Sequence, residues 1–128
     1  MTKTEIEQLV TEYYGQVAAL NSEAWLEAFA EDAVVYDPVG KPPLNARRDA
    51  DKFFEILSKF YEKLEITPDL IFSAGNGAAV KWIMNVLARN GRRATTEGIA
   101  IFEFNEVGKI QKLQSYWDEA AMKAKLMG

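Results

Sequence analysis

The sequence predicts a single α+β domain over residues 1–128, with helices first and an antiparallel sheet after them. In the first half of the chain, apolar side chains recur every three or four positions, which is typical of amphipathic helices. Beyond Glu65 the pattern changes to strand-like alternation, and Asn90-Gly91 separates two such segments, a strong signal for a β-hairpin. Helices grouped ahead of strands favour a fold whose helices cover one face of the sheet.

Three amphipathic helices are expected before the sheet. The first covers about residues 4–20, because Thr4 and Glu7 have the spacing of a capping box and an apolar stripe follows. Its stripe consists of Ile6, Leu9, Val10, Tyr13, Val17 and Leu20. A short second helix begins after Asn21 and ends near Ala30. The third covers residues 47–63, where Lys and Glu fill the polar face.

The strands are expected to form a strongly curved, mostly antiparallel sheet. Val34 to Tyr36 favour a short strand that Pro38 ends, and the proline-rich residues 38–43 predict a rigid loop. The expected strands are 33–37, an edge-like strand at 66–72, and strands at 78–89, 93–104 and 110–117. A polar tail rich in Lys and Ala follows. We therefore expect three N-terminal helices packed on the sheet as a cone-shaped roll with an apolar mouth.

Composition excludes several classes of function. Nineteen acidic and fifteen basic residues give a net charge of -4 with no basic stripe, so nucleic acid is not an expected partner. The chain has no long apolar run, so we expect no membrane segment and a cytoplasmic protein. With no His and no Cys, the sequence predicts no metal site and no cofactor, and leaves carboxylates, phenols and lysines for chemistry.

Asp37 and Tyr13 are the candidate catalytic residues. Asp37 ends a strand on which Val35 should face inward, although an aspartate before a proline is also a common way to start a turn. Tyr13 lies on the apolar stripe of the first helix, where plain core packing is the competing interpretation. Tyr14 lies off that stripe and is the reserve candidate. A carboxylate and a phenol that face one apolar cavity could move a proton between carbon atoms while holding an enolate oxygen.

Several stretches of the chain resemble bacterial ketosteroid isomerases. Residues 34–43, with Asp37-Pro38-Val39-Gly40, resemble the loop whose aspartate shuttles the steroid proton in that family, and 30–33, 102–110 and 115–117 fit its pattern in the same order. The resemblance implies the nuclear transport factor 2-like cone fold, Asp37 as base, Tyr13 as hydrogen-bond donor, a small hydrophobic ligand, and a homodimer through the sheet face. The expected substrate-binding residues are Val17, Phe29, Val35, Phe54, Leu57, Ala100, Leu113, Ser115 and Trp117.

The sequence also departs from that family. Ala100 stands where the isomerases carry a second acid that donates to the oxyanion, so weak activity on steroids is expected. Phe29 and Phe54 stand where some members have tyrosines that support the catalytic phenol. Glu97 has the opposite strand parity to Ala100 and should face outward unless Gly98 forms a bulge.

Two other functions stay open on the sequence. A polyketide cyclase-like enzyme would also use an acid in the cone, and a noncatalytic binding module would only hold an apolar ligand. Residues 79–88 are partly apolar on both faces, so the sequence does not decide which face lines the cavity and which would meet a second subunit.

Overall fold

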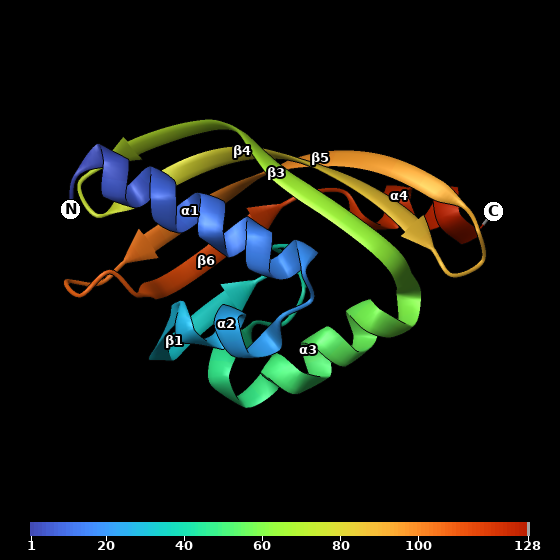
Figure 1. The fold of residues 1–128 in the computed structure, drawn as a ribbon, viewed down its shortest axis with the longest axis horizontal. Helices are drawn as coiled ribbons and strands as arrows, with labels where there is room; N and C mark the ends of the chain where they lie inside the picture. Colours follow the sequence, from blue (N-terminus) through green and yellow to red (C-terminus); the bar gives the residue numbers. More distant parts are fainter. Residues whose placement is uncertain (128) are drawn as a thin grey trace.

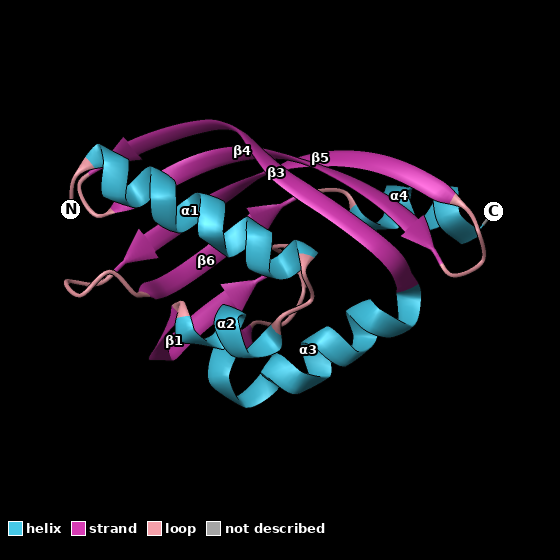
Figure 2. Cartoon of the chain, in the orientation of Figure 1, coloured by secondary structure: helices cyan, strands magenta, loops and turns pink. Residues whose placement is uncertain are grey.

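A computed structural model describes residues 1–127 of the chain as one sheet with four helices. The elements, in order, are α1 Lys3–Ala18, α2 Ser22–Glu27, β1 Phe29–Tyr36, β2 Leu44–Asn45, α3 Ala46–Phe60, β3 Tyr61–Ala74, β4 Gly77–Ala88, β5 Arg93–Phe104, β6 Ile110–Tyr116 and α4 Glu119–Met127. Figure 1 follows this path from blue to red, and Figure 2 separates helices from strands. The predicted α+β fold, with helices on a curved, mostly antiparallel sheet, is confirmed.

The sheet has six strands in the order β2-β1-β6-β5-β4-β3. Among the strands of residues 1–127, β1 and β6 run parallel and every other neighbouring pair is antiparallel, with the hairpins from β3 to β6 forming the long antiparallel part. Helix α1 lies along the concave side of the sheet, and α2 and α3 lie below it (Figure 1). Helix α4 packs near β5 beyond the last strand. The arrangement leaves a hollow between the helices and the concave face of the sheet.

The faces of β4 are distinguished by burial. Val80, Trp82, Met84 and Val86 are buried on the concave side, while the residues between them are partly or fully exposed. The same alternation continues on β5, where Ala100 is buried and Glu97 is exposed. The β4–β5 register runs without a break through Gly98, so there is no bulge at this position and Glu97 faces outward, where it pairs with Lys81.

The beginning of α1 differs from the predicted capping box. Thr2, rather than Thr4, is the N-cap, because the Thr2 hydroxyl accepts a hydrogen bond from the Glu5 amide and also donates to the Glu5 side chain. Thr2 and Glu5 have the same three-residue spacing as Thr4 and Glu7. The capping pattern alone therefore does not decide between these two starting positions. The other end of the helix also differs, since α1 ends at Ala18 instead of residue 20.

Two predicted helix ends were too late, because strand pairing takes over. α2 ends at Glu27, and β1 begins at Phe29, which is fully buried and pairs with Ile110 of β6. α3 ends at Phe60 instead of residue 63, because the adjoining Tyr61 pairs with Ala88 of β4. β3 is consequently longer than the predicted 66–72 strand, although it does lie at the sheet edge.

The C-terminal tail is helical, which the sequence analysis did not predict. Asp118 accepts a hydrogen bond from the Ala121 amide at the start of α4, as an N-cap residue does. Met122 and Leu126 of this helix are almost fully buried. Two anchoring apolar residues are too few for a clear periodic pattern, so the signal of this helix was weak. Across residues 1–127, no helix has the length and apolar character to span a membrane.

Candidate active site

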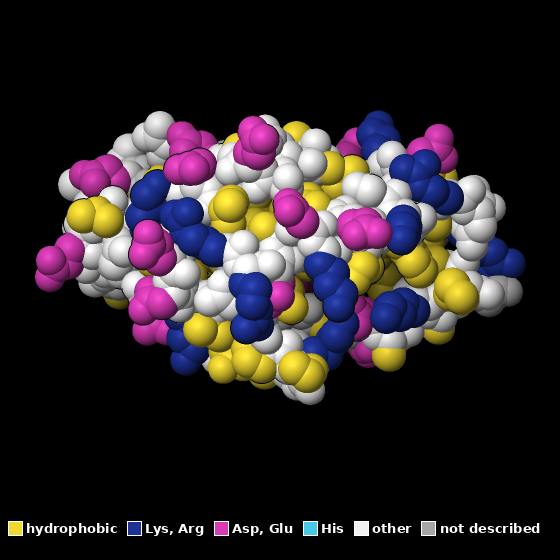
Figure 3. Space-filling model, turned by 90° about the horizontal axis from the view of Figure 1, so that it is seen from below, with side chains coloured by type: hydrophobic (Ala, Val, Ile, Leu, Met, Phe, Trp, Pro, Cys, Tyr) yellow, Lys and Arg dark blue, Asp and Glu magenta, His cyan; other side chains and the backbone are white. Residues whose placement is uncertain are grey.

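A cavity of about 390 Å³ lies between the helices and the concave face of the sheet. Its wall is mostly apolar, with contributions from α1, α3, β3, β4, β5 and β6. Figure 3 shows the lower face of the molecule, where apolar side chains are visible at depth between charged ones. The volume is within the range of pockets that enclose most of a small organic ligand. The hollow predicted from the sequence is therefore open rather than filled by side chains.

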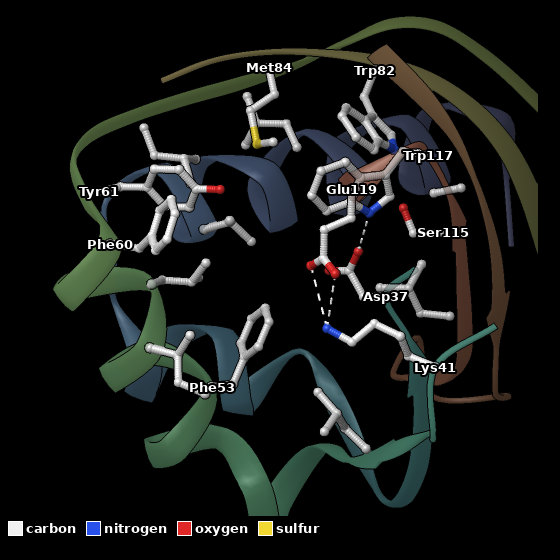
Figure 4. Close-up of a pocket in the computed structure, with 18 of the residues that line it drawn as sticks. Asp37, Lys41, Phe53, Phe60, Tyr61, Trp82, Met84, Ser115, Trp117 and Glu119 are labelled. Carbon is white, nitrogen blue, oxygen red and sulfur yellow. Dashed lines mark hydrogen bonds and ion pairs between the residues drawn. The ribbon is translucent and has the colours of Figure 1, made fainter. Parts of the chain in front are cut away.

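Asp37 follows β1 directly and lines this cavity. The indole Nε1–H of Trp117 donates a hydrogen bond to Asp37 Oδ1 at 2.7 Å (Figure 4). The loop after Asp37 is tied to β6 by a second bond, in which the Val39 amide donates to the Ser115 carbonyl at 2.8 Å. Both contacts fix the carboxyl group at the edge of an apolar space.

The surroundings of Asp37 shift its acidity. Burial raises the pKa of the Asp37 carboxyl to about 6, and the Trp117 hydrogen bond opposes this rise by favouring the charged form. The negative charge of Glu119 adds to the rise, and the positive charge of Lys41 reduces it. A carboxyl group with a pKa near 6 can both accept and return a proton close to neutral pH.

Tyr13 and Tyr14 both line the cavity from α1, with only 5% and 4% of their surfaces exposed. Burial raises the pKa of each phenol well above its usual range, and the charge of Asp37 raises both further. Both hydroxyls therefore stay protonated at neutral pH and can donate hydrogen bonds. Tyr14 was expected to lie off the apolar stripe. It is buried because α1 packs against β3 and the Tyr14 ring packs edge-on against Phe102 of β5.

Trp25 lies behind Tyr13, within the aromatic cluster around Phe29. Its ring centroid is 4.4 Å from that of Phe29, which in turn packs edge-on against Tyr13. The proximity of Trp25 partly opposes the rise in the pKa of Tyr13. Its buried Nε1–H makes no hydrogen bond of normal geometry to a described residue. Trp25 therefore supports the phenol mainly by packing.

The structure brings most of the predicted site residues to one cavity. Those on its wall are Tyr13, Val17, Asp37, Leu57, Ala100, Leu113, Ser115 and Trp117. Phe29, Val35 and Phe54 are not on the wall; they are buried in the core behind it. Strand and helix periodicity identifies inward-facing positions, but it does not separate a cavity wall from a solid core. Phe53, the neighbour of Phe54, lines the cavity from α3 instead.

Gly98 makes room for the indole that holds Asp37. A Cβ atom at this position would lie 2.5 Å from the Trp82 ring, 2.6 Å from the Tyr116 carbonyl oxygen and 2.8 Å from the Trp117 Cβ atom. These distances are shorter than van der Waals contact, so no larger residue fits without displacing the chain. The two indoles pack edge-on with centroids 5.8 Å apart. The absence of a side chain at Gly98 of β5 thus allows Trp117 to reach Asp37.

Two charged residues of the cavity, Lys41 and Glu119, were not predicted from the sequence. Lys41 belongs to the proline-rich loop, and Glu119 is the first residue of α4. Lys41 Nζ lies 3.1 Å from Glu119 Oε1 (Figure 4). Nothing local in the sequence connects two positions 78 residues apart, and the tail was not expected to be helical. Among residues 1–127, no three acidic side chains gather closely enough to hold a metal ion.

Comparison with known proteins identifies one matching family and solved structures of similar fold. Residues 10–113 match a family described as the SnoaL-like domain. The chain is similar to a crystal structure of an NTF2-like protein of unknown function from Burkholderia pseudomallei K96243, with a TM-score of 0.86, 21% identity and 100% of both chains covered. It is also similar to PrhC from Penicillium brasilianum NBRC 6234, with a TM-score of 0.85, 16% identity, and coverage of 99% of this chain and 88% of the other. At such identities the likeness shows a shared fold.

Proposed function

The chain belongs to the SnoaL-like domain family of the NTF2-like superfamily, and on that premise we propose that it is a ketosteroid isomerase-like enzyme. Such an enzyme shifts a proton within a hydrophobic carbonyl compound. The superfamily covers isomerases, polyketide cyclases and noncatalytic binders, so the choice among them depends on the site. The observation that supports an isomerase is that Asp37 and Tyr13 line one apolar cavity.

In the proposed reaction, the Asp37 carboxylate removes a proton from the carbon next to the substrate carbonyl. The electron pair of that C–H bond moves into an enolate, and the Tyr13 hydroxyl donates a hydrogen bond to the enolate oxygen. The protonated Asp37 then returns the same proton to another carbon of the conjugated system. The double bond moves, the carbonyl re-forms, and no external oxidant or reductant is needed.

The protonation states of the two groups support these roles. Because the pKa of Asp37 is raised to about 6, a large majority of the molecules carry the carboxylate at pH 7. The Tyr13 pKa is raised, so the phenol remains a donor at the same pH. The Trp117 hydrogen bond orients the carboxyl group throughout. One group thus serves as base and the other as donor without any change in pH.

Ala100 predicts a slower enzyme than one with two oxyanion donors. Its small apolar side chain lines the cavity and offers no hydrogen bond. Loss of one oxyanion donor typically lowers kcat by a factor of about 10² to 10³. We therefore propose that activity on steroids is weak.

The experiment for this proposal compares two aspartate variants in a Δ5-to-Δ4 ketosteroid isomerisation assay. Asp37→Asn keeps the shape of the side chain but cannot accept the proton, so turnover should fall by about 10² to 10⁴-fold while ligand binding is retained. Asp32→Asn is the matched control, because Asp32 is an exposed carboxylate of β1 that contacts Gln111 away from the cavity. Equal turnover of the Asp37→Asn and native proteins would refute the assignment of the base.

A noncatalytic binding module is the second candidate, and Ala100 is the observation that favours it. Such a module would hold an apolar ligand in the same cavity without stabilising an enolate oxygen. A 2-naphthol probe separates the two functions, because its oxygen resembles that of an enolate. An enzyme should bind it less tightly after Tyr13→Phe, whereas a simple carrier should show the same affinity. A polyketide cyclase-like enzyme would share the acid but act on a different substrate shape.

A further inference from the structure

An ion pair at the mouth of the cavity joins two segments that are distant in the sequence. Lys41 Nζ lies 3.1 Å from Oε1 and 3.4 Å from Oε2 of Glu119. The Glu119 side chain is 23% exposed and that of Lys41 is 52% exposed. In Figure 4 the Glu119 carboxylate points toward the polar end of the cavity, between Trp117 and the Lys41 ammonium. The pair therefore lies at the boundary between the cavity and the solvent.

The same two segments meet at Asp37. Lys41 is four residues beyond Asp37 in the loop, and Glu119 is two residues beyond Trp117 at the start of α4. Two contacts therefore join residues 37–41 to residues 117–119. One is the hydrogen bond from Trp117 to Asp37, and the other is the ion pair between Lys41 and Glu119. A change in one contact should alter the position of the other.

The charged and titratable side chains on the cavity wall come from five parts of the fold. Besides Asp37 they are Tyr13, Tyr14, Lys41, Asp49, Lys52, Tyr61, Glu119 and Lys123. The pKa of each of the three tyrosines is raised by burial, so they are neutral near pH 6. Asp49 is paired with Arg48, and Lys123 with Glu119. Glu119 and Lys41 are the charged groups whose fields act on the Asp37 carboxyl, with opposite signs.

We propose that Lys41 and Glu119 form a positioning pair, which ties the loop after Asp37 to α4 and balances the charge that the Asp37 carboxyl faces. This inference rests on the proposed function, because it matters only if Asp37 is the base. The pair does not touch the reacting atoms. Its effect is to keep the base oriented by Trp117 and ionisable in the range where proton transfer is reversible.

The test is to follow the ionisation of Asp37 by the 13C NMR signal of its side-chain carboxyl group, assigned by its loss in Asp37→Asn. Glu119→Gln removes a neighbouring negative charge, so the pKa of Asp37 should fall by about one unit. Lys41→Gln removes a positive charge, so the same pKa should rise by a similar amount. The double variant should return close to the native value, because the two effects have opposite signs.

A matched ion pair on the same molecule provides the control. Lys59 and Glu55 pair at 2.9 Å on the exposed surface of α3, and neither lines the cavity. Glu55→Gln and Lys59→Gln change the net charge of the protein by the same amounts as Glu119→Gln and Lys41→Gln. They therefore report the effect of net charge alone, because neither residue lines the cavity that contains Asp37. The Asp37 titration should not move measurably in these variants.

The possible results have distinct meanings. Opposite shifts in the two cavity variants, absent in the control variants, support the positioning pair. Shifts in the same direction, or no larger than those of the controls, overturn it. The titration requires no substrate, so it remains informative if the native protein shows no isomerase activity. In that case opposite shifts would retain the pair while the proposed function fails.

Discussion

The chemistry of one half-buried carboxyl group, that of Asp37, is the feature on which the proposed function depends. Asp37 lies where a strand meets a proline-rich loop, and the fold surrounds it with apolar side chains and one indole donor. Removal of a carboxylate from water disfavours its charged form, and one hydrogen bond restores only part of the lost solvation. The raised pKa of Asp37 follows from this imbalance.

A raised pKa in the folded state makes stability depend on pH. The folded chain holds the Asp37 proton up to about pH 6, whereas the unfolded chain releases it near pH 3.8. The contribution of Asp37 is therefore fully present below pH 3.8 and is lost as the pH rises through 6. Asp37→Asn does not ionise, so its free energy of unfolding should rise relative to that of the native protein as the pH increases from 3.8 through 6. Above pH 7 the gain should level off at no more than about 3 kcal/mol.

Urea unfolding at pH 4.5, 5.5 and 7.5 measures this difference. Asp32→Asn corrects for the loss of one negative charge, since Asp32 is exposed on β1. The native protein and Asp37→Asn should differ least at pH 4.5. A difference that stays constant over this pH range would mean that the pKa of Asp37 is not raised in the folded protein.

At the scale of the elements, strands β3 to β6 present an outer face on which exposed apolar residues flank Lys81, which pairs with Asp69 and Glu97. Tyr116, Ile99, Lys81 and Leu70 lie opposite one another in adjacent strands, so they form one row across the sheet. Ile99, Tyr116 and Leu70 are each about half exposed, and Phe72 in the next row is 69% exposed. Apolar residues gathered on one face are typical of a surface that contacts another protein.

We propose that a second copy of the chain covers this face, which agrees with the homodimer expected from the sequence. Light scattering after gel filtration should give the mass of a dimer for the native protein. Ile99→Lys places a second positive charge in the row, directly opposite Lys81, and should give a monomer. Val107→Lys is the control, because Val107 is an exposed apolar residue of the turn after β5 and should not affect the dimer. A monomeric native protein would contradict the proposal.

Much of the molecule could be predicted from the sequence because its signals are local. The strand end at Asp37 and the helical stripe through Tyr13 indicated two inward-facing groups, and both residues line the cavity. The Lys41–Glu119 contact had no such signal, because it joins a loop to α4, and the tail sequence did not predict that helix. The burial of Phe29, Val35 and Phe54 behind the wall depends on packing among several elements, which periodicity does not describe.

For the whole molecule, the proposed function requires the fold to hold an acid and a phenol on either side of one ligand. A crystal structure of the native protein with 2-naphthol would show whether the molecule does so. The naphthol oxygen should lie within about 3 Å of the Tyr13 hydroxyl, with the ring in the cavity beside Asp37. A naphthol bound outside the cavity, or with its oxygen turned away from both Tyr13 and Tyr14, would contradict it.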